Sequence, residues 1–137
     1  MRLLIDTNVV LDALMNREPW SEQAHEVILA AAEEKAEGCV SASAFTDIHY
    51  ILSKYLRSKD DVMTALIGLL RILTVLDVSG SDCEKAYDLP MPDYEDALLA
   101  SCGKRHKVDY IVTRNKRHYK GSPVKAVEPG EILSMLS

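Results

Sequence analysis

The feature that most constrains this chain is a short apolar run, Leu-Leu-Ile at residues 3–5, that ends in an aspartate. The run does not alternate with polar residues, which is typical of a strand buried on both faces of a parallel sheet. Asp6 follows directly, and residues 9–16 have the apolar spacing of a helix that Asn8 can cap. Ligands of open α/β sheets bind at the carboxyl ends of the strands. We therefore expect Asp6 either to hold a cation or to cap this helix.

The rest of the chain repeats this alternation of strands and helices. Further strands are expected at residues 39–42, 72–78, 109–113 and 124–127. Helices are expected at 21–37 with Gly38 as the stop, from Ser43 to Tyr55, at 58–70, from Ser81, at 93–102, and from Pro129 to Leu136. The pattern predicts a three-layer α/β/α fold with a mostly parallel sheet of four to five strands. With 137 residues and no visible linker, we expect one domain spanning residues 1–137.

Four aspartates fall where these strands end or these helices begin, namely Asp6, Asp47, Asp93 and Asp96. Carboxylates gathered at one edge of a sheet repel one another unless a cation lies among them. Oxygen ligands of this kind suit Mg²⁺ or Mn²⁺ rather than zinc. Each acid taken singly could instead cap a helix or interact with its dipole. We expect the carboxylates of Asp12, Asp60 and Asp61 to be solvated rather than catalytic.

Charge and cysteine usage narrow the class of protein. A net charge of -5 argues against nucleic-acid binding through bulk positive charge, but it permits binding through metals and a local basic patch. Cys39, Cys83 and Cys102 lack a zinc-binding spacing and are expected to be reduced thiols. The first apolar run is too short for a signal peptide, and no run reaches membrane-spanning length. We therefore expect a cytoplasmic protein without membrane contact.

Four blocks of the sequence, in this order and spacing, resemble the PIN domain family. They are residues 3–12 (LLIDTNVVLD), 41–52 (SASAFTDIHYIL), 93–98 (DYEDAL) and 111–116 (IVTRNK). The resemblance covers nearly the whole chain. It implies that Asp6, Asp47 and Asp96 are catalytic, metal-binding acids and that Asp93 lies beside them.

The resemblance also implies supporting residues around the acids, and the sequence departs from the family pattern at two positions. The supporting positions are Thr7 and Asn8 next to the first acid, Thr113 at the end of a strand on the same edge, and Asn115 where many relatives have a fourth acid. Asp47 stands where many PIN domains have Glu, so its carboxylate reaches less far. Asn115 keeps an oxygen but loses a charge, which weakens a second metal more than a first.

The function that the resemblance implies is that of a metal-dependent ribonuclease. One or two Mg²⁺ or Mn²⁺ ions, held by Asp6, Asp96 and either Asp47 or Asp93, would lower the pKa of a bound water and direct it at phosphorus. The products would carry a 5′-phosphate and a 3′-hydroxyl. Many relatives are toxins of the VapC type, so the resemblance implies RNA as substrate, a small antitoxin protein as partner, and a homodimer. The densest basic run could then line the path of the RNA, although such a run is also common in solvated loops. It comprises Arg114, Lys116, Arg117 and Lys120.

Two alternatives remain open. A PIN-like module with weak or no activity would bind nucleic acid or a partner without cutting. A receiver-like signalling domain would use an aspartate as phosphoacceptor, but that arrangement expects an acidic pair after the first strand, where this chain has Asp6 alone.

Overall fold

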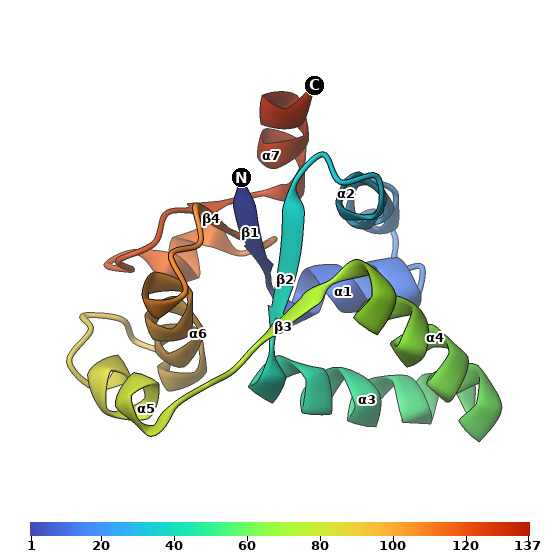
Figure 1. The fold of residues 1–137 in the computed structure, drawn as a ribbon, viewed down its shortest axis with the longest axis horizontal. Coiled ribbons are helices and arrows are strands. Elements are labelled where there is room, and N and C mark those ends of the chain that lie inside the picture. Colours follow the sequence, from blue (N-terminus) through green and yellow to red (C-terminus); the bar gives the residue numbers. More distant parts are fainter.

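The computed structural model describes residues 1–137 and contains a five-stranded, all-parallel sheet with helices on both faces (Figure 1). The strands are β1 (Arg2–Ile5), β2 (Glu37–Ser41), β3 (Thr74–Leu76), β4 (Tyr110–Val112) and β5 (Ala126–Val127). Their order across the sheet is β3-β2-β1-β4-β5, and Leu4 at the centre pairs with Cys39 and Ile111. The predicted α/β fold with a parallel sheet is confirmed.

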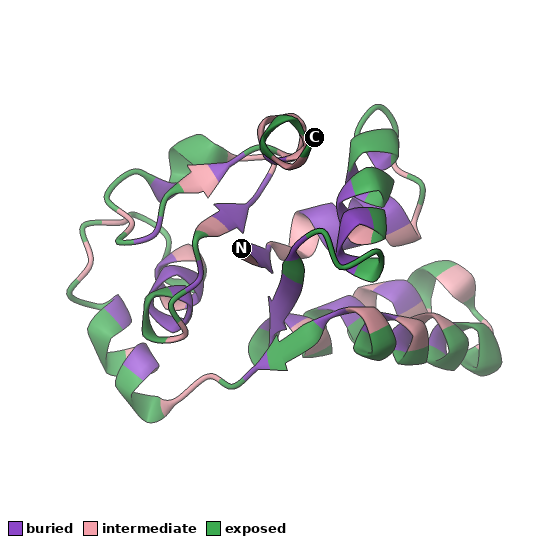
Figure 2. Ribbon diagram, turned by 45° about the horizontal axis from the view of Figure 1, so that its top comes forward, coloured by how far each residue is buried: buried purple, intermediate pink, exposed green.

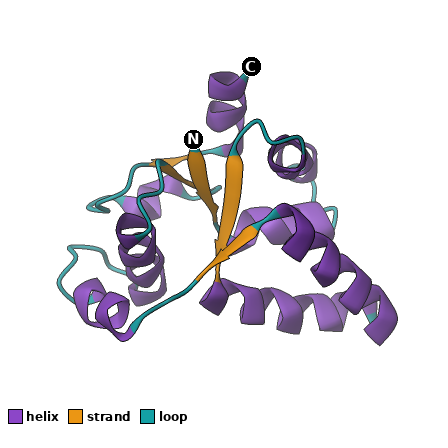
Figure 3. Cartoon of the chain, in the orientation of Figure 1, coloured by secondary structure: helices purple, strands orange, loops and turns teal.

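One group of helices covers one face of the sheet, and a second group lies on the other face (Figure 3). The first group is α1 (Thr7–Leu14), α2 (Ser21–Ala32), α3 (Ala42–Leu56), α4 (Lys59–Ile72) and α7 (Pro129–Leu136). The second group is α6 (Tyr94–Arg105) and the short 3-10 helix η1 (Lys116–Tyr119), and α5 (Gly80–Ala86) packs on the outer side of α6. None of these helices has both the length and the apolar character needed to cross a membrane.

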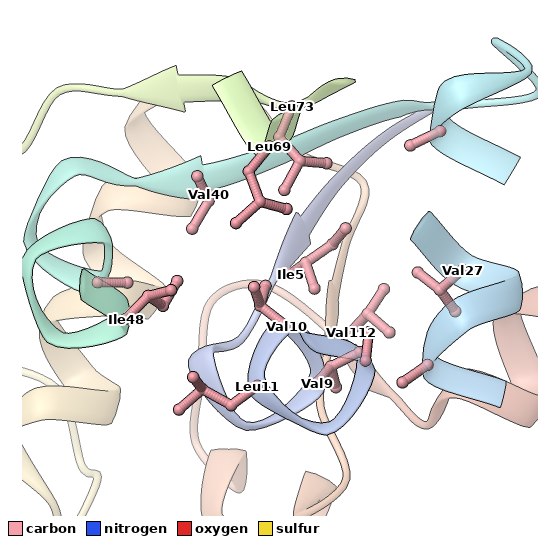
Figure 4. Packing of buried hydrophobic residues seen from close by; sticks show 14 of the residues in the cluster. Ile5, Val9, Val10, Leu11, Val27, Val40, Ile48, Leu69, Leu73 and Val112 are labelled. Atoms are coloured by element: carbon pink, nitrogen blue, oxygen red, sulfur yellow. The ribbon is translucent and has the colours of Figure 1, made fainter. Parts of the chain in front are cut away.

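The central strand explains why the first apolar run does not alternate. Leu3 and Ile5 belong to the larger hydrophobic core, under α1 to α4, whereas Leu4 faces the smaller core under α6. In Figure 4, Ile5 lies near Val10 of α1 and Val112 of the neighbouring strand. Burial concentrates on the central strands and the inner sides of the helices, whereas the edge strand β3 is largely exposed (Figure 2). Each fully buried Leu or Ile contributes about 1.5–3 kcal/mol to this core.

The strand order places a switch point beside β1. The chain proceeds from β1 through β2 to β3 on one side, and then crosses back to β4 on the other side. In sheets of this kind the ligand crevice lies outside the carboxyl ends of the strands at such a point. Receiver-like folds have the order 2-1-3-4-5 instead. The receiver-like alternative is therefore wrong for this chain.

Several expected element boundaries differ in the structure. Helix α2 ends at Ala32, so Gly38 does not stop it but lies within β2. A Cβ atom at Gly38 would come within 2.8 Å of the Ala31 Cβ and of a Leu73 methyl, so the close approach of β2 to its neighbours requires glycine there. Helices α1 and α3 also begin earlier than expected, with Asp6 and Ser41 as their caps in place of Asn8 and Ser43.

Candidate acid site at the carboxyl edge of the sheet

Asp6 lies at the carboxyl end of β1, directly at the switch point. Its Oδ1 accepts the N–H of Thr7 at 2.8 Å, which caps α1. Its Oδ2 accepts the hydroxyl of Thr113 at 2.9 Å from the end of β4, and the side-chain amide of Asn8 lies at 3.5 Å. The two strand ends are thus joined through one carboxylate. The expected supporting residues Thr7, Asn8 and Thr113 all contact Asp6.

Asp96 approaches the same place from α6. The carboxylate of Asp93 caps this helix by accepting the N–H of Asp96 at 2.9 Å. The hydroxyl of Tyr119 lies 3.1 Å from Asp6 Oδ2 and 3.3 Å from Asp96 Oδ1. A single hydroxyl group therefore stands between the carboxylates of β1 and α6.

A cavity of about 80 Å³ lies beside this acid pair. It is lined by Asp6, Thr7, Ser41, Ser43, Ala44, Asp47, Glu95, Asp96, Leu98 and Leu99. Asp47 lines it from the second turn of α3, which begins at Ala42. The structure thus brings together three of the four expected acids. Asp93 caps α6 and is not among the lining residues.

Sequence reasoning missed two residues of this site, Glu95 and Tyr119. Glu95 stands between two expected acids in the first turn of α6, so its position at a helix start was a usable signal. Tyr119 is 113 residues from Asp6 and carries no sequence signal that links it to the acids. Asn115 touches the site only through its backbone N–H, which donates to the Thr113 hydroxyl at 3.2 Å.

The acids shift one another's protonation. Burial raises the pKa of Asp6 above its ordinary value, although the hydrogen bonds from Thr113 and Tyr119 oppose this shift. Burial and the charges of Asp6 and Asp93 raise the pKa of Asp96 to about 6. Burial and then the charge of Asp47 also raise the pKa of Glu95. The site therefore disfavours further negative charge and favours a cation.

The donor set suits a hard divalent ion that keeps part of its hydration shell. Nowhere in the structure do three acidic, histidine or cysteine side chains lie close enough together to enclose a metal ion. Mg²⁺ is commonly held by one or two carboxylates together with waters and substrate phosphates, without a closed protein cage. Asp6 and Asp96, which share the Tyr119 hydroxyl, match this arrangement.

The basic segment after β4 is divided between paired and free cations. Arg114 donates to both oxygens of Asp12, at 2.9 and 3.2 Å, and its guanidinium lies 3.9 Å from the centre of the Trp20 ring. Lys116 pairs with Glu131 of α7 at 2.8 Å. Arg117 and Lys120 are exposed and form no ion pair within the chain.

Asp12 is not solvated, contrary to expectation. Its side chain is only 1% exposed, and Arg17 pairs with it at 2.9 Å in addition to Arg114. A carboxylate buried to this degree needs such partners, because an unpaired buried charge is strongly destabilising. The Asp12 cluster therefore anchors the start of the basic segment to α1.

The chain matches one family model and resembles several solved structures. A model of the PIN domain family matches residues 2–117. A chain of VapBC2 from Rickettsia felis, solved with a promoter DNA fragment, has a TM-score of 0.72 and 20% identity over 93% of this chain and 98% of that chain. A chain of DNA-bound VapBC from Salmonella typhimurium has a TM-score of 0.70 and 18% identity, over 94% of this chain and 98% of that chain.

A third solved structure is a toxin described as cleaving the Sarcin-Ricin loop. It is VapC20 from Mycobacterium tuberculosis, with a TM-score of 0.60 and 16% identity over 80% of this chain and 86% of that chain. No curated protein matches the chain significantly. Likenesses at these identities establish a shared fold.

Proposed function

The chain belongs to the PIN domain family, and on this basis we propose that it is a ribonuclease that depends on Mg²⁺ or Mn²⁺. The observation that carries the proposal is the meeting of Asp6 and Asp96 at one hydroxyl, beside a cavity that Asp47 and Glu95 also line. This cluster lies at the switch point of the sheet, where ligands of such folds bind.

The protein's own residues would hold and orient the ion. Asp6 and Asp96 would bind it, and Asp47 or Glu95, which line the same cavity, would act through a coordinated water. A bound divalent ion lowers the pKa of a coordinated water and neutralises charge that develops on the phosphate. Hydrogen bonds from the Thr7 N–H and the Thr113 hydroxyl orient the Asp6 carboxylate. This chemistry needs no Ser, Cys or His nucleophile from the chain.

We also propose RNA as the substrate and a small antitoxin protein as the partner. Support for the partner comes from the VapBC complexes, whose chains share this fold. Support for RNA comes from the family and from the VapC20 toxin. The three free cysteines suit a reducing compartment such as the cytoplasm, where we place the protein. A homodimer remains a prediction from the family resemblance.

The test is cleavage of short single-stranded RNA by the purified protein, with and without Mg²⁺ or Mn²⁺. We expect 5′-phosphate products from the wild type and no products from Asp6→Asn or Asp96→Asn. Asn is the appropriate replacement at residue 6 because it removes the charge but keeps an oxygen that caps α1. Asp60→Asn, on the exposed first turn of α4, should cleave like the wild type and controls for the loss of an acid in general.

Cleavage that persists in both site variants would show that these acids do not carry the reaction. The absence of three closely placed ligands favours testing one alternative in the same assay, namely a binding module. Wild-type protein that binds RNA but leaves it intact with either metal would support that alternative.

A further inference from the structure

Tyr119 makes a pair of contacts that neither packing nor the proposed ligand set explains. Its side chain is only 4% exposed, and its hydroxyl lies 3.1 Å from Asp6 Oδ2 and 3.3 Å from Asp96 Oδ1. The ring belongs to the smaller core, among residues such as Leu99 and Ile111. A phenylalanine ring would fill the same space. The hydroxyl must therefore be explained by what it contacts.

A buried hydroxyl is costly unless it is hydrogen-bonded, and here both partners are acids of the site. The hydroxyl carries one proton, so it can donate fully to only one of the two carboxylates at a time. Placed between them, it keeps two like charges close together that would otherwise repel and turn apart. Thr113 and the Thr7 N–H hold only Asp6. Among these donors, Tyr119 alone connects Asp6 with Asp96.

We propose that Tyr119 is a positioning residue that holds Asp6 and Asp96 in a converging arrangement and thereby tightens the binding of a divalent cation. The inference rests on the proposed function, because it concerns the ion that these acids would bind. Groups that hydrogen-bond to metal ligands typically change metal affinity by about 10- to 100-fold when they are removed. The opposite effect would be expected if the hydroxyl merely occupied the place of the cation, since its removal would then tighten binding.

The experiment compares Mn²⁺ binding by the wild type and Tyr119→Phe without RNA, by electron paramagnetic resonance of free Mn²⁺ and by calorimetry. We expect the dissociation constant of the variant to rise by about tenfold or more. In cleavage assays the Mn²⁺ concentration at half-maximal rate should rise by a similar factor, and saturating Mn²⁺ should restore most of the rate. A general loss of folded protein would instead lower the rate at every Mn²⁺ concentration, including saturating Mn²⁺.

Tyr94→Phe is the matched control. Its hydroxyl also donates a hydrogen bond, to the Cys83 carbonyl at 2.8 Å, but it contacts none of the acids of the site. The control should bind Mn²⁺ like the wild type, and circular dichroism should show that both variants are folded.

Two failures can be told apart. If the wild type binds Mn²⁺, Asp6→Asn does not, and Tyr119→Phe binds as tightly as the wild type or more tightly, the role of Tyr119 is overturned and the proposed function stands. If the wild type itself neither binds Mn²⁺ nor cleaves RNA, the proposed function fails and the inference fails with it.

Discussion

At the scale of single residues, Asp6 has two roles that are usually considered alternatives. Its Oδ1 caps α1 through the Thr7 N–H, while its Oδ2 faces Thr113 and Tyr119. A cap and a metal ligand need different oxygens, so one carboxylate can serve both. Replacement of Asp6 by Ala would therefore mix a loss of helix stability, about 1 kcal/mol, with a loss of the site.

The raised pKa of Asp96 predicts a specific dependence of stability on pH. This pKa is raised to about 6, so the folded, metal-free protein retains a proton that the unfolded chain releases between about pH 4 and pH 6. The wild type should therefore lose stability relative to Asp96→Asn as the pH rises through this window. Urea midpoints of both proteins in EDTA, at about pH 4.5 and 6.5, measure the difference.

Parallel pH curves for the two proteins would mean that Asp96 titrates at its ordinary value. The same shift has a consequence for binding. Because a carboxylate must lose its proton to bind a metal, the affinity of the wild type for Mn²⁺ should fall as the pH drops below about 6.

At the scale of elements, the close packing of β2 depends on Gly38. A Cβ atom there would meet the Ala31 Cβ of α2, which has no rotamer by which to withdraw. Strand β2 lies next to β1, so a shift of β2 would also disturb the strand that leads into Asp6. Packing between elements, remote from the acids, thus helps to set the geometry of the site.

We predict that Gly38→Ala lowers the free energy of unfolding by about 1–3 kcal/mol through overpacking. Gly68→Ala is the matched control, because no atom lies within 4 Å of a Cβ at that position in α4. The control should be neutral or stabilised by up to about 1 kcal/mol, since alanine favours a helix over glycine. Denaturant unfolding of the two variants gives the comparison, and equal stabilities would contradict the packing argument.

The segment that contains η1 is held at two points. Arg114 pairs with the buried Asp12 of α1 and stacks on Trp20, and Lys116 pairs with Glu131 of α7. The expected RNA contacts of these two cations stay a prediction. Removal of Arg114 would also take a partner from the buried Asp12 carboxylate, so a loss of RNA binding in that variant would mix a loss of stability with a loss of contact.

At the scale of the whole molecule, a net charge of -5 means that RNA must be held by local positive charge or by metal. Arg117 and Lys120 are the exposed, unpaired cations of the segment that also carries Tyr119. Because they flank Tyr119 in the chain, whose hydroxyl contacts the acids, we expect them to pair with phosphates near the bond to be cut.

We predict that Arg117→Ala with Lys120→Ala weakens RNA binding across sequences. The slope of log affinity against log salt should flatten by about one unit for each phosphate that the variant no longer neutralises. Binding should be measured with Ca²⁺ in place of Mg²⁺ to suppress cleavage, and Mn²⁺ affinity should be unaffected. Lys104→Ala with Lys125→Ala removes two exposed cations near the amino ends of β4 and β5, at the opposite edge of the sheet, and is the control. An unchanged slope in the first variant would place the RNA path elsewhere.

The sequence by itself determined the elements and the edge at which the acids would gather. The unbroken apolar run at residues 3–5 predicts a central parallel strand, because both of its faces must be buried. Asp6 after that strand, and Asp96 in the first turn of a helix, could be assigned to the same edge, because parallel strands end on one side. These inferences depend only on neighbouring residues and on their periodicity.

Only the tertiary structure decided which distant side chains meet. The strand order sets β4 beside β1, and this brings Tyr119 to Asp6 across 113 residues and Arg114 to Asp12 across 102. The same packing made Gly38 a point of close approach within a strand, where the sequence alone suggested a helix stop. Contacts of this kind depend on how elements stack in space, and local propensity carries no information about that stacking.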